Sequence, residues 1–136
     1  MSISAIRSKT QEIERLAQSE TGSVHDCLKL LLELFSEAEQ VLDQIDANDE
    51  RAFRLRDEVI ETQAQILNKA AALKAPLIRD ALYKLALWRW WSASEIDAKP
   101  DAMCPADAVV YSAFLDLAEI LGERGVLTDQ DLTQKR

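Results

Sequence analysis

The sequence predicts an all-α protein: a bundle of four main helices, with a thinner N-terminal helix before them. Only three glycines and three prolines occur in 136 residues, too few for the many turns of an all-β chain. Residues with a low cost of helix formation dominate the composition. The chain is 48% apolar, and its apolar residues recur at helical spacing. We therefore expect one domain over residues 1–122, followed by a mobile tail over residues 123–136, which has little to bury.

The first two helices are separated by a polar break around Gly22. Residues 4–18 carry a thin apolar face and predict a modest amphipathic helix. Ser23 is the expected N-cap of the second helix, with Asp26 three residues later. Apolar residues then follow one another at steps of four and three, which indicates a long helix packed along its length. They are Val24, Leu28, Leu31, Phe35, Ala38, Leu42 and Ile45. Leu30 and Leu34 lie off this row, so they offer spare apolar surface for an interface.

A third helix is expected over residues 50–73, joined to the second by a short turn into a long antiparallel hairpin. Its expected buried side consists of Phe53, Leu55, Val59, Ile60, Ile66, Leu67, Ala70 and Leu73. Pro76 is expected to end this helix or to begin the next one, because proline is costly inside a helix. A kinked helix that continues through Pro76 is the alternative.

The fourth helix, residues 75–92, contains all three tryptophans and is apolar on most sides. It is therefore expected to be the central helix of the bundle. Trp90 and Trp91 are adjacent and cannot both face one core, so one of them is expected at an interface, where tryptophan is enriched. The basic residues between the aromatics do not form a single stripe at 3.6 residues per turn.

The last helix is expected to begin near Pro105 and to end at Gly122. Its expected buried stripe consists of Val110, Phe114, Leu117 and Leu121.

Composition and motifs exclude several classes of function. The net charge of −8 argues against general binding to nucleic acid or to anionic membranes. Two cysteines, Cys27 and Cys104, and a single histidine supply neither a disulfide framework nor an ordinary metal site. No charge-free run approaches the length of a membrane span, and no Gly-rich phosphate loop occurs. We expect a soluble, reduced, cytoplasmic protein without metal or cofactor, and not an enzyme.

His25 and Asp26, followed by Leu28 and Leu32, are the one group that suggests chemistry. The segment resembles the phosphoacceptor motif in the dimerisation and phosphotransfer helices of histidine kinases, where an acid and then apolar residues follow the histidine. The resemblance implies a helical hairpin in which His25 accepts a phosphoryl group while Asp26 assists proton transfer. It covers residues 25–32 only, and the Lys-Gly of stand-alone phosphotransfer domains is missing. The simpler interpretation is a surface histidine beside a capping aspartate.

The function that the sequence predicts best is therefore that of an interaction or assembly protein, expected as a homodimer. Leu30, Leu34, Trp90 and Trp91 are the predicted interface residues. Phosphotransfer through His25 and Asp26 is the first alternative. Binding of a small apolar ligand or of nucleic acid through the basic, tryptophan-rich helix is the second.

Overall fold

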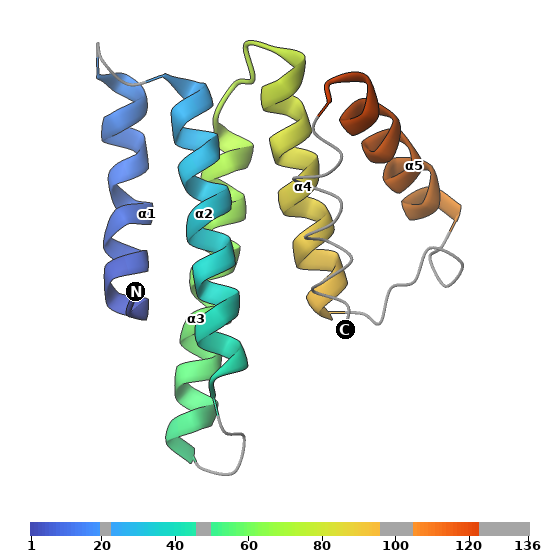
Figure 1. Cartoon of the computed structure of the whole chain (residues 1–136). Coiled ribbons are helices and arrows are strands. Elements are labelled where there is room, and N and C mark those ends of the chain that lie inside the picture. Colours follow the sequence, from blue (N-terminus) through green and yellow to red (C-terminus); the bar gives the residue numbers. More distant parts are fainter. Residues whose placement is uncertain (20–22, 46–49, 96–104, 123–136) are drawn as a thin grey trace. The chain divides into compact units, whose positions relative to one another are not determined.

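The computed structural model describes residues 1–19, 23–45, 50–95 and 105–122, and these ranges form five α-helices (Figure 1). The all-α prediction is confirmed. The helices are α1 (Ile3–Gln18), α2 (Val24–Asp43), α3 (Glu50–Ala72), α4 (Ile78–Glu95) and α5 (Pro105–Ile120). The expected tail, residues 123–136, lies outside the described residues.

The chain divides into two compact units. Unit 1 is Met1–Pro76 and contains α1, α2 and α3, whereas unit 2 is Leu77–Arg136 and contains α4 and α5. Pro76 lies between α3 and α4, so no helix continues through it. The single domain expected over residues 1–122 stays a prediction.

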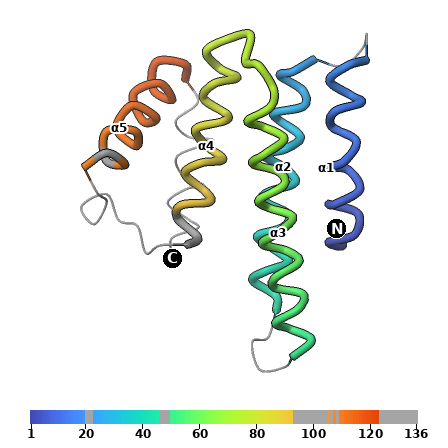
Figure 2. The backbone as a smooth tube through the Cα atoms, turned by 180° about the vertical axis from the view of Figure 1, so that it is seen from behind, coloured from blue at the N-terminus to red at the C-terminus, as the bar shows by residue number. Residues whose placement is uncertain are grey.

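In unit 1, α2 and α3 run in opposite directions and α1 packs beside both (Figures 1 and 2). Two contacts fix the position of α1 along α3. The Arg7 guanidinium donates to Thr62 Oγ1 at 3.5 Å, and Glu14 pairs with Lys69, each with a separation of 55 residues. The constant separation shows that α1 runs parallel to α3. The C-terminal end of α2 and the N-terminal end of α3 extend beyond the start of α1 at Ile3 (Figure 1).

The core of unit 1 contains the apolar row predicted for α2. Leu28, Leu31, Phe35 and Ala38 are fully buried, and Ser23 caps the helix by accepting a hydrogen bond from the Asp26 amide at 3.0 Å. The thin apolar face of α1 is docked as well, because its Ile6 and Ile13 are fully buried.

The predicted buried side of α3 is wrong at two positions. Phe53 is 59% exposed and Ile60 is also exposed, whereas Thr62 and Gln63 are buried. Burial of these two polar residues is possible because each is hydrogen-bonded. Thr62 Oγ1 donates to the carbonyl of Glu58 at 2.7 Å, and the Gln63 amide donates to a Glu39 carboxylate oxygen at 2.6 Å.

In unit 2, α5 packs against α4. The buried residues of α4 include Leu82, Leu87 and Trp90, and those of α5 are Tyr111, Phe114 and Ala118. The stripe predicted for α5 is confirmed at Phe114 and wrong at Val110, which is exposed, while Leu117 and Leu121 are half-buried. Helix α5 begins at Pro105 and is followed by Gly122 with φ +70°, as expected for a glycine at a helix end.

Candidate interaction surfaces

The four predicted interface residues differ in accessibility. Leu34 is 1% exposed and Trp90 is 2% exposed, so neither has surface left to bury against another protein. Leu30 and Trp91 are half-buried and keep some accessible surface. The interface prediction therefore needs correction at Leu34 and Trp90, and it stays a prediction for Leu30 and Trp91.

Helix α1 explains the burial of Leu34. The amino group of Met1 lies 3.9 Å from the Glu37 carboxylate, so α1 starts beside that turn of α2. Leu34 and Leu30 precede Glu37 by three and seven residues, which places all three on one side of α2. Helix α1 therefore packs on the side of α2 that carries Leu30 and Leu34, which the sequence suggested as spare apolar surface.

The two adjacent tryptophans face different sides of α4, Trp90 inward and Trp91 half outward. Arg89, which precedes Trp90, is fully buried, with its guanidinium carbon 4.3 Å from the centre of the Tyr111 ring. At this distance a cation and an aromatic ring attract each other. One cation of the basic, tryptophan-rich helix is therefore engaged within unit 2 and does not face solvent. This weakens the nucleic-acid alternative.

Among the described residues of unit 2, the most exposed apolar side chains lie on α5. Val109 and Ile120 are 70% and 76% exposed, and Ala113 is exposed between them. Steps of four and seven place these three residues on one side of the helix, away from the buried Tyr111, Phe114 and Ala118. We call them the α5 outer face. The sequence interpretation missed it, although the two apolar sides of α5 can be read from the sequence.

Helix α4 also has a side that is not fully covered, which we call the α4 open side. It consists of Ile78, Ala81, Leu85 and Trp88, at steps of three, four and three. Ile78 is exposed and the other three are half-buried. Unit 2 thus presents apolar surface on both of its described helices.

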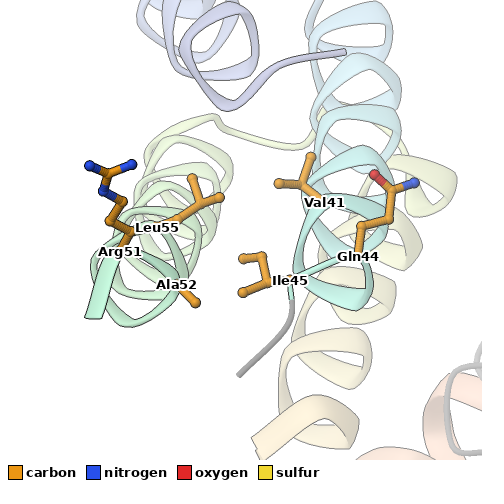
Figure 3. Close-up of a pocket in the computed structure, with 6 residues that line it drawn as sticks. All are labelled: Val41, Gln44, Ile45, Arg51, Ala52 and Leu55. Atoms are coloured by element: carbon orange, nitrogen blue, oxygen red, sulfur yellow. The ribbon is translucent and has the colours of Figure 1, made fainter. Parts of the chain in front are cut away.

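A third apolar surface lies in unit 1, between the C-terminal end of α2 and the N-terminal end of α3. Figure 3 shows Val41 of α2 and Ile45, which follows the end of α2, pointing toward α3, where Leu55 lies, while Gln44 and Arg51 point away from the gap. The pocket has a volume of about 390 Å³ and is open to solvent, since none of its lining residues is buried. Leu55 precedes Thr62 by seven residues, so the pocket continues the line along which α1 contacts α3. The lining residues are Val41, Gln44, Ile45, Arg51, Ala52 and Leu55.

His25 and Asp26 lie in the first turn of α2, where His25 is half-buried and Asp26 is exposed. Cys27 beside them is buried, and burial together with the charge of Asp26 raises the pKa of its thiol. A raised pKa lowers the thiolate fraction and hence the reactivity of a cysteine. Cys104 lies outside the described residues. Phosphotransfer through His25 stays a prediction.

No group of His, Cys, Asp and Glu side chains within the described ranges is arranged to hold a metal ion. No helix in these ranges is long and apolar enough to cross a membrane. Comparison of the chain with protein-family models, with curated proteins and with solved structures finds no match. Within the described residues, the exposed apolar surfaces are the features that suggest a function.

Proposed function

We propose that this chain is a small cytoplasmic assembly protein that self-associates through unit 2 and performs no chemical step of its own. The observation that supports this proposal is the α5 outer face. Val109 and Ile120 are large apolar side chains in a well-formed helix, yet each leaves most of its surface in water. Val109, Ala113 and Ile120 lie on one side of α5, and exposed apolar side chains gathered on one side of a helix are typical of an interaction site.

The energy available from this face sets the kind of assembly that we expect. Burial of one such side chain contributes about 1.5 to 3 kcal/mol. Two copies bring four side chains, Val109 and Ile120 from each, or roughly 6 to 12 kcal/mol in total. Association costs about 4 to 15 kcal/mol in lost freedom of motion. The outer face alone therefore supports a weak, concentration-dependent assembly, and a stable one needs further apolar surface.

The test is the molar mass in solution, measured by light scattering over a range of protein concentrations. The double variant Val109→Lys/Ile120→Lys keeps good helix formers in α5 but removes its apolar face. We expect the unaltered protein to associate and the double variant to remain monomeric with an unchanged far-UV circular dichroism spectrum. Ser112→Lys, an exposed position on the same helix but beside the face, is the control and should associate normally.

Two results would count against self-association through α5. One is an unaltered protein that remains monomeric at every concentration. The other is a double variant that associates as tightly as the unaltered protein.

A further inference from the structure

We propose that the pocket between the C-terminal end of α2 and the N-terminal end of α3 is a docking site for a short, basic amphipathic helix of a partner protein. The docked helix lies in the same groove as α1 and continues it beyond Ile3. This site belongs to unit 1, so the proposal does not depend on self-association through unit 2.

The wall that α3 contributes to the groove extends past the start of α1. The two contacts that fix α1 along α3 join residues 55 apart, which places Ile3 level with Glu58. Ala52 and Leu55 of the pocket precede Glu58 on α3, and they therefore lie beyond the first residue of α1.

The wall that α2 contributes extends in the same way. The Met1 amino group lies 3.9 Å from the Glu37 carboxylate. Val41 of the pocket follows Glu37 by four residues, which is about one helical turn. The pocket is thus continuous with an interface that a helix already occupies.

Helix α1 shows what kind of segment this groove accepts. Ile6 and Ile13, which are seven residues apart, are fully buried where α1 packs on α2 and α3. The part of α3 from Arg51 to Glu58 also spans seven residues, or about 10 Å of helix. A helix with aliphatic side chains at this spacing therefore matches the length of the pocket and its apolar lining. The apolar lining residues are Val41, Ile45, Ala52 and Leu55.

Charge favours a basic partner. Residues 37–58, which include both walls of the pocket, contain eight acidic and three basic residues. One acid lies on each wall near the apolar lining, since Glu37 precedes Val41 by four residues and Glu58 follows Leu55 by three. Both acids keep accessible surface. Lysine or arginine beside the apolar stripe of the docked helix meets opposite charge there, whereas an acidic helix places like charges together at a cost.

A second copy of this chain matches the pocket less well than a basic partner does. The α5 outer face is acidic as well as apolar, because Asp116 follows Val109 by seven residues and lies along it. The basic residues of α4 already interact with other groups of the chain. These residues are Arg79, Lys84 and Arg89.

The test uses the full chain and a fluorescently labelled peptide built on α1. The peptide has the sequence of residues 3–18 with Glu12→Lys and Glu14→Lys, which makes it strongly basic. Fluorescence anisotropy should show saturable binding that weakens as the salt concentration increases. The same peptide with Ile6→Ser and Ile13→Ser keeps its charge and should not bind. Absence of saturable binding up to about 1 mM protein would overturn the proposal.

Substitution of the lining places the peptide in the pocket. Val41→Ser/Leu55→Ser removes two apolar side chains from the lining and should weaken binding about tenfold or more. Phe53→Ser removes an exposed apolar side chain of the same helix outside the pocket, and its affinity should stay within about twofold of the original. Equal effects of the two variants would contradict docking in the pocket.

A charge reversal tests the acidic rim with little risk to folding, because Glu58 is exposed. Glu58→Lys should weaken binding of the basic peptide about tenfold at low salt. Glu33→Lys makes the same change in net charge at an exposed position of α2 that does not line the pocket, and it should have a much smaller effect. Equal weakening by both variants would show a general attraction to the acidic chain and would overturn the assignment.

Two other occupants give different results. If the peptide displaced α1 instead of docking beyond it, Ile6→Val in the protein would loosen α1 and strengthen binding, whereas docking in the pocket predicts no change. If a second copy filled the pocket, Val41→Ser/Leu55→Ser would lower the molar mass of the protein in solution. Either result would overturn the choice of a partner helix. Val109→Lys/Ile120→Lys should bind the peptide normally, so failure of self-association leaves this test intact.

Discussion

Glu39 is an acidic residue of α2 whose carboxylate accepts a hydrogen bond from the buried Gln63. Burial raises its pKa, the bond from Gln63 acts in the opposite direction, and the charge of Asp43 adds to the rise. The net result is a pKa above the ordinary value of 4.5. The folded state therefore holds the proton more tightly than the unfolded state does. The resulting stabilisation is complete below the ordinary pKa and is lost as the pH rises through the raised value.

The variant Glu39→Gln should remove this pH dependence while keeping an oxygen that can accept from Gln63. We expect the variant to gain stability relative to the unaltered protein as the pH increases from about 4 to about 7. Urea unfolding at several pH values measures this difference. Glu14→Gln, an exposed position that pairs with Lys69, is the control. A difference between Glu39→Gln and the unaltered protein that stays constant over this range would show that Glu39 does not titrate as described.

Arg89 and Tyr111 form a contact between a cation and an aromatic ring in unit 2. Both are buried, so the guanidinium is shielded from water and its attraction to the ring is worth about 2 kcal/mol. Tyr111→Leu removes the ring and should lower the free energy of unfolding by at least that amount. Tyr111→Phe keeps the ring and should cost less. Urea unfolding followed by tryptophan emission makes the comparison, and equal losses in the two variants would contradict a role for the ring face.

At the scale of the helix, the capping of α2 by Ser23 is the clearest agreement between local sequence and structure. The Ser23 hydroxyl oxygen accepts from the Asp26 amide, one of the amides that the helix itself leaves without a partner. Ser23→Ala should lower the free energy of unfolding by about 0.5 to 2 kcal/mol. Ser23→Asp keeps an acceptor and should lose much less. The urea midpoints of the two variants measure the effect, and equal values would show that the cap contributes nothing.

Helices α2, α3 and α5 show how far the sequence predicts which side of a helix is buried. Helix α2 has one long row of apolar residues, and the middle of this row, from Leu28 to Ala38, is buried as expected, whereas its ends, Val24, Leu42 and Ile45, are half-buried. Helix α3 has two overlapping rows of apolar residues. The sequence did not reveal that Phe53 and Ile60 belong to the row that faces solvent. The buried side of α3 includes the polar residues Thr62 and Gln63, which apolar spacing does not select. Their burial depends on hydrogen bonds to other parts of the chain. Helix α5 has apolar residues on two sides, and spacing alone does not choose between them.

At the scale of the whole molecule, the prediction of exposed interface residues failed where one helix covers another. The spacing of Leu34 correctly placed it off the main row of α2, but the sequence could not show that α1 would occupy that side. The position of α1 depends on contacts between residues 55 apart, such as Arg7 with Thr62, and no local pattern records them. The α5 outer face, in contrast, was accessible to sequence reasoning, because Val109, Ala113 and Ile120 already lie on one side at helical spacing.

The division into two units makes a prediction about unfolding. All three tryptophans lie in α4, so their emission reports on unit 2, whereas circular dichroism reports on the helices of both units. Ile13 is fully buried in α1, and Ile13→Ala should destabilise unit 1 by about 2 to 5 kcal/mol. Because each unit has its own buried core, we expect this variant to shift part of the circular dichroism transition and to leave the tryptophan transition unchanged.

The same measurement connects stability with assembly. If unit 2 forms the dimer contact, its tryptophan transition should move to higher urea as the protein concentration increases, because association stabilises only the folded state. The transition of unit 1 should not depend on concentration. A joint shift of both transitions in Ile13→Ala would instead identify one cooperative domain, as the sequence predicted for residues 1–122. A tryptophan transition that is independent of concentration would argue against assembly through unit 2.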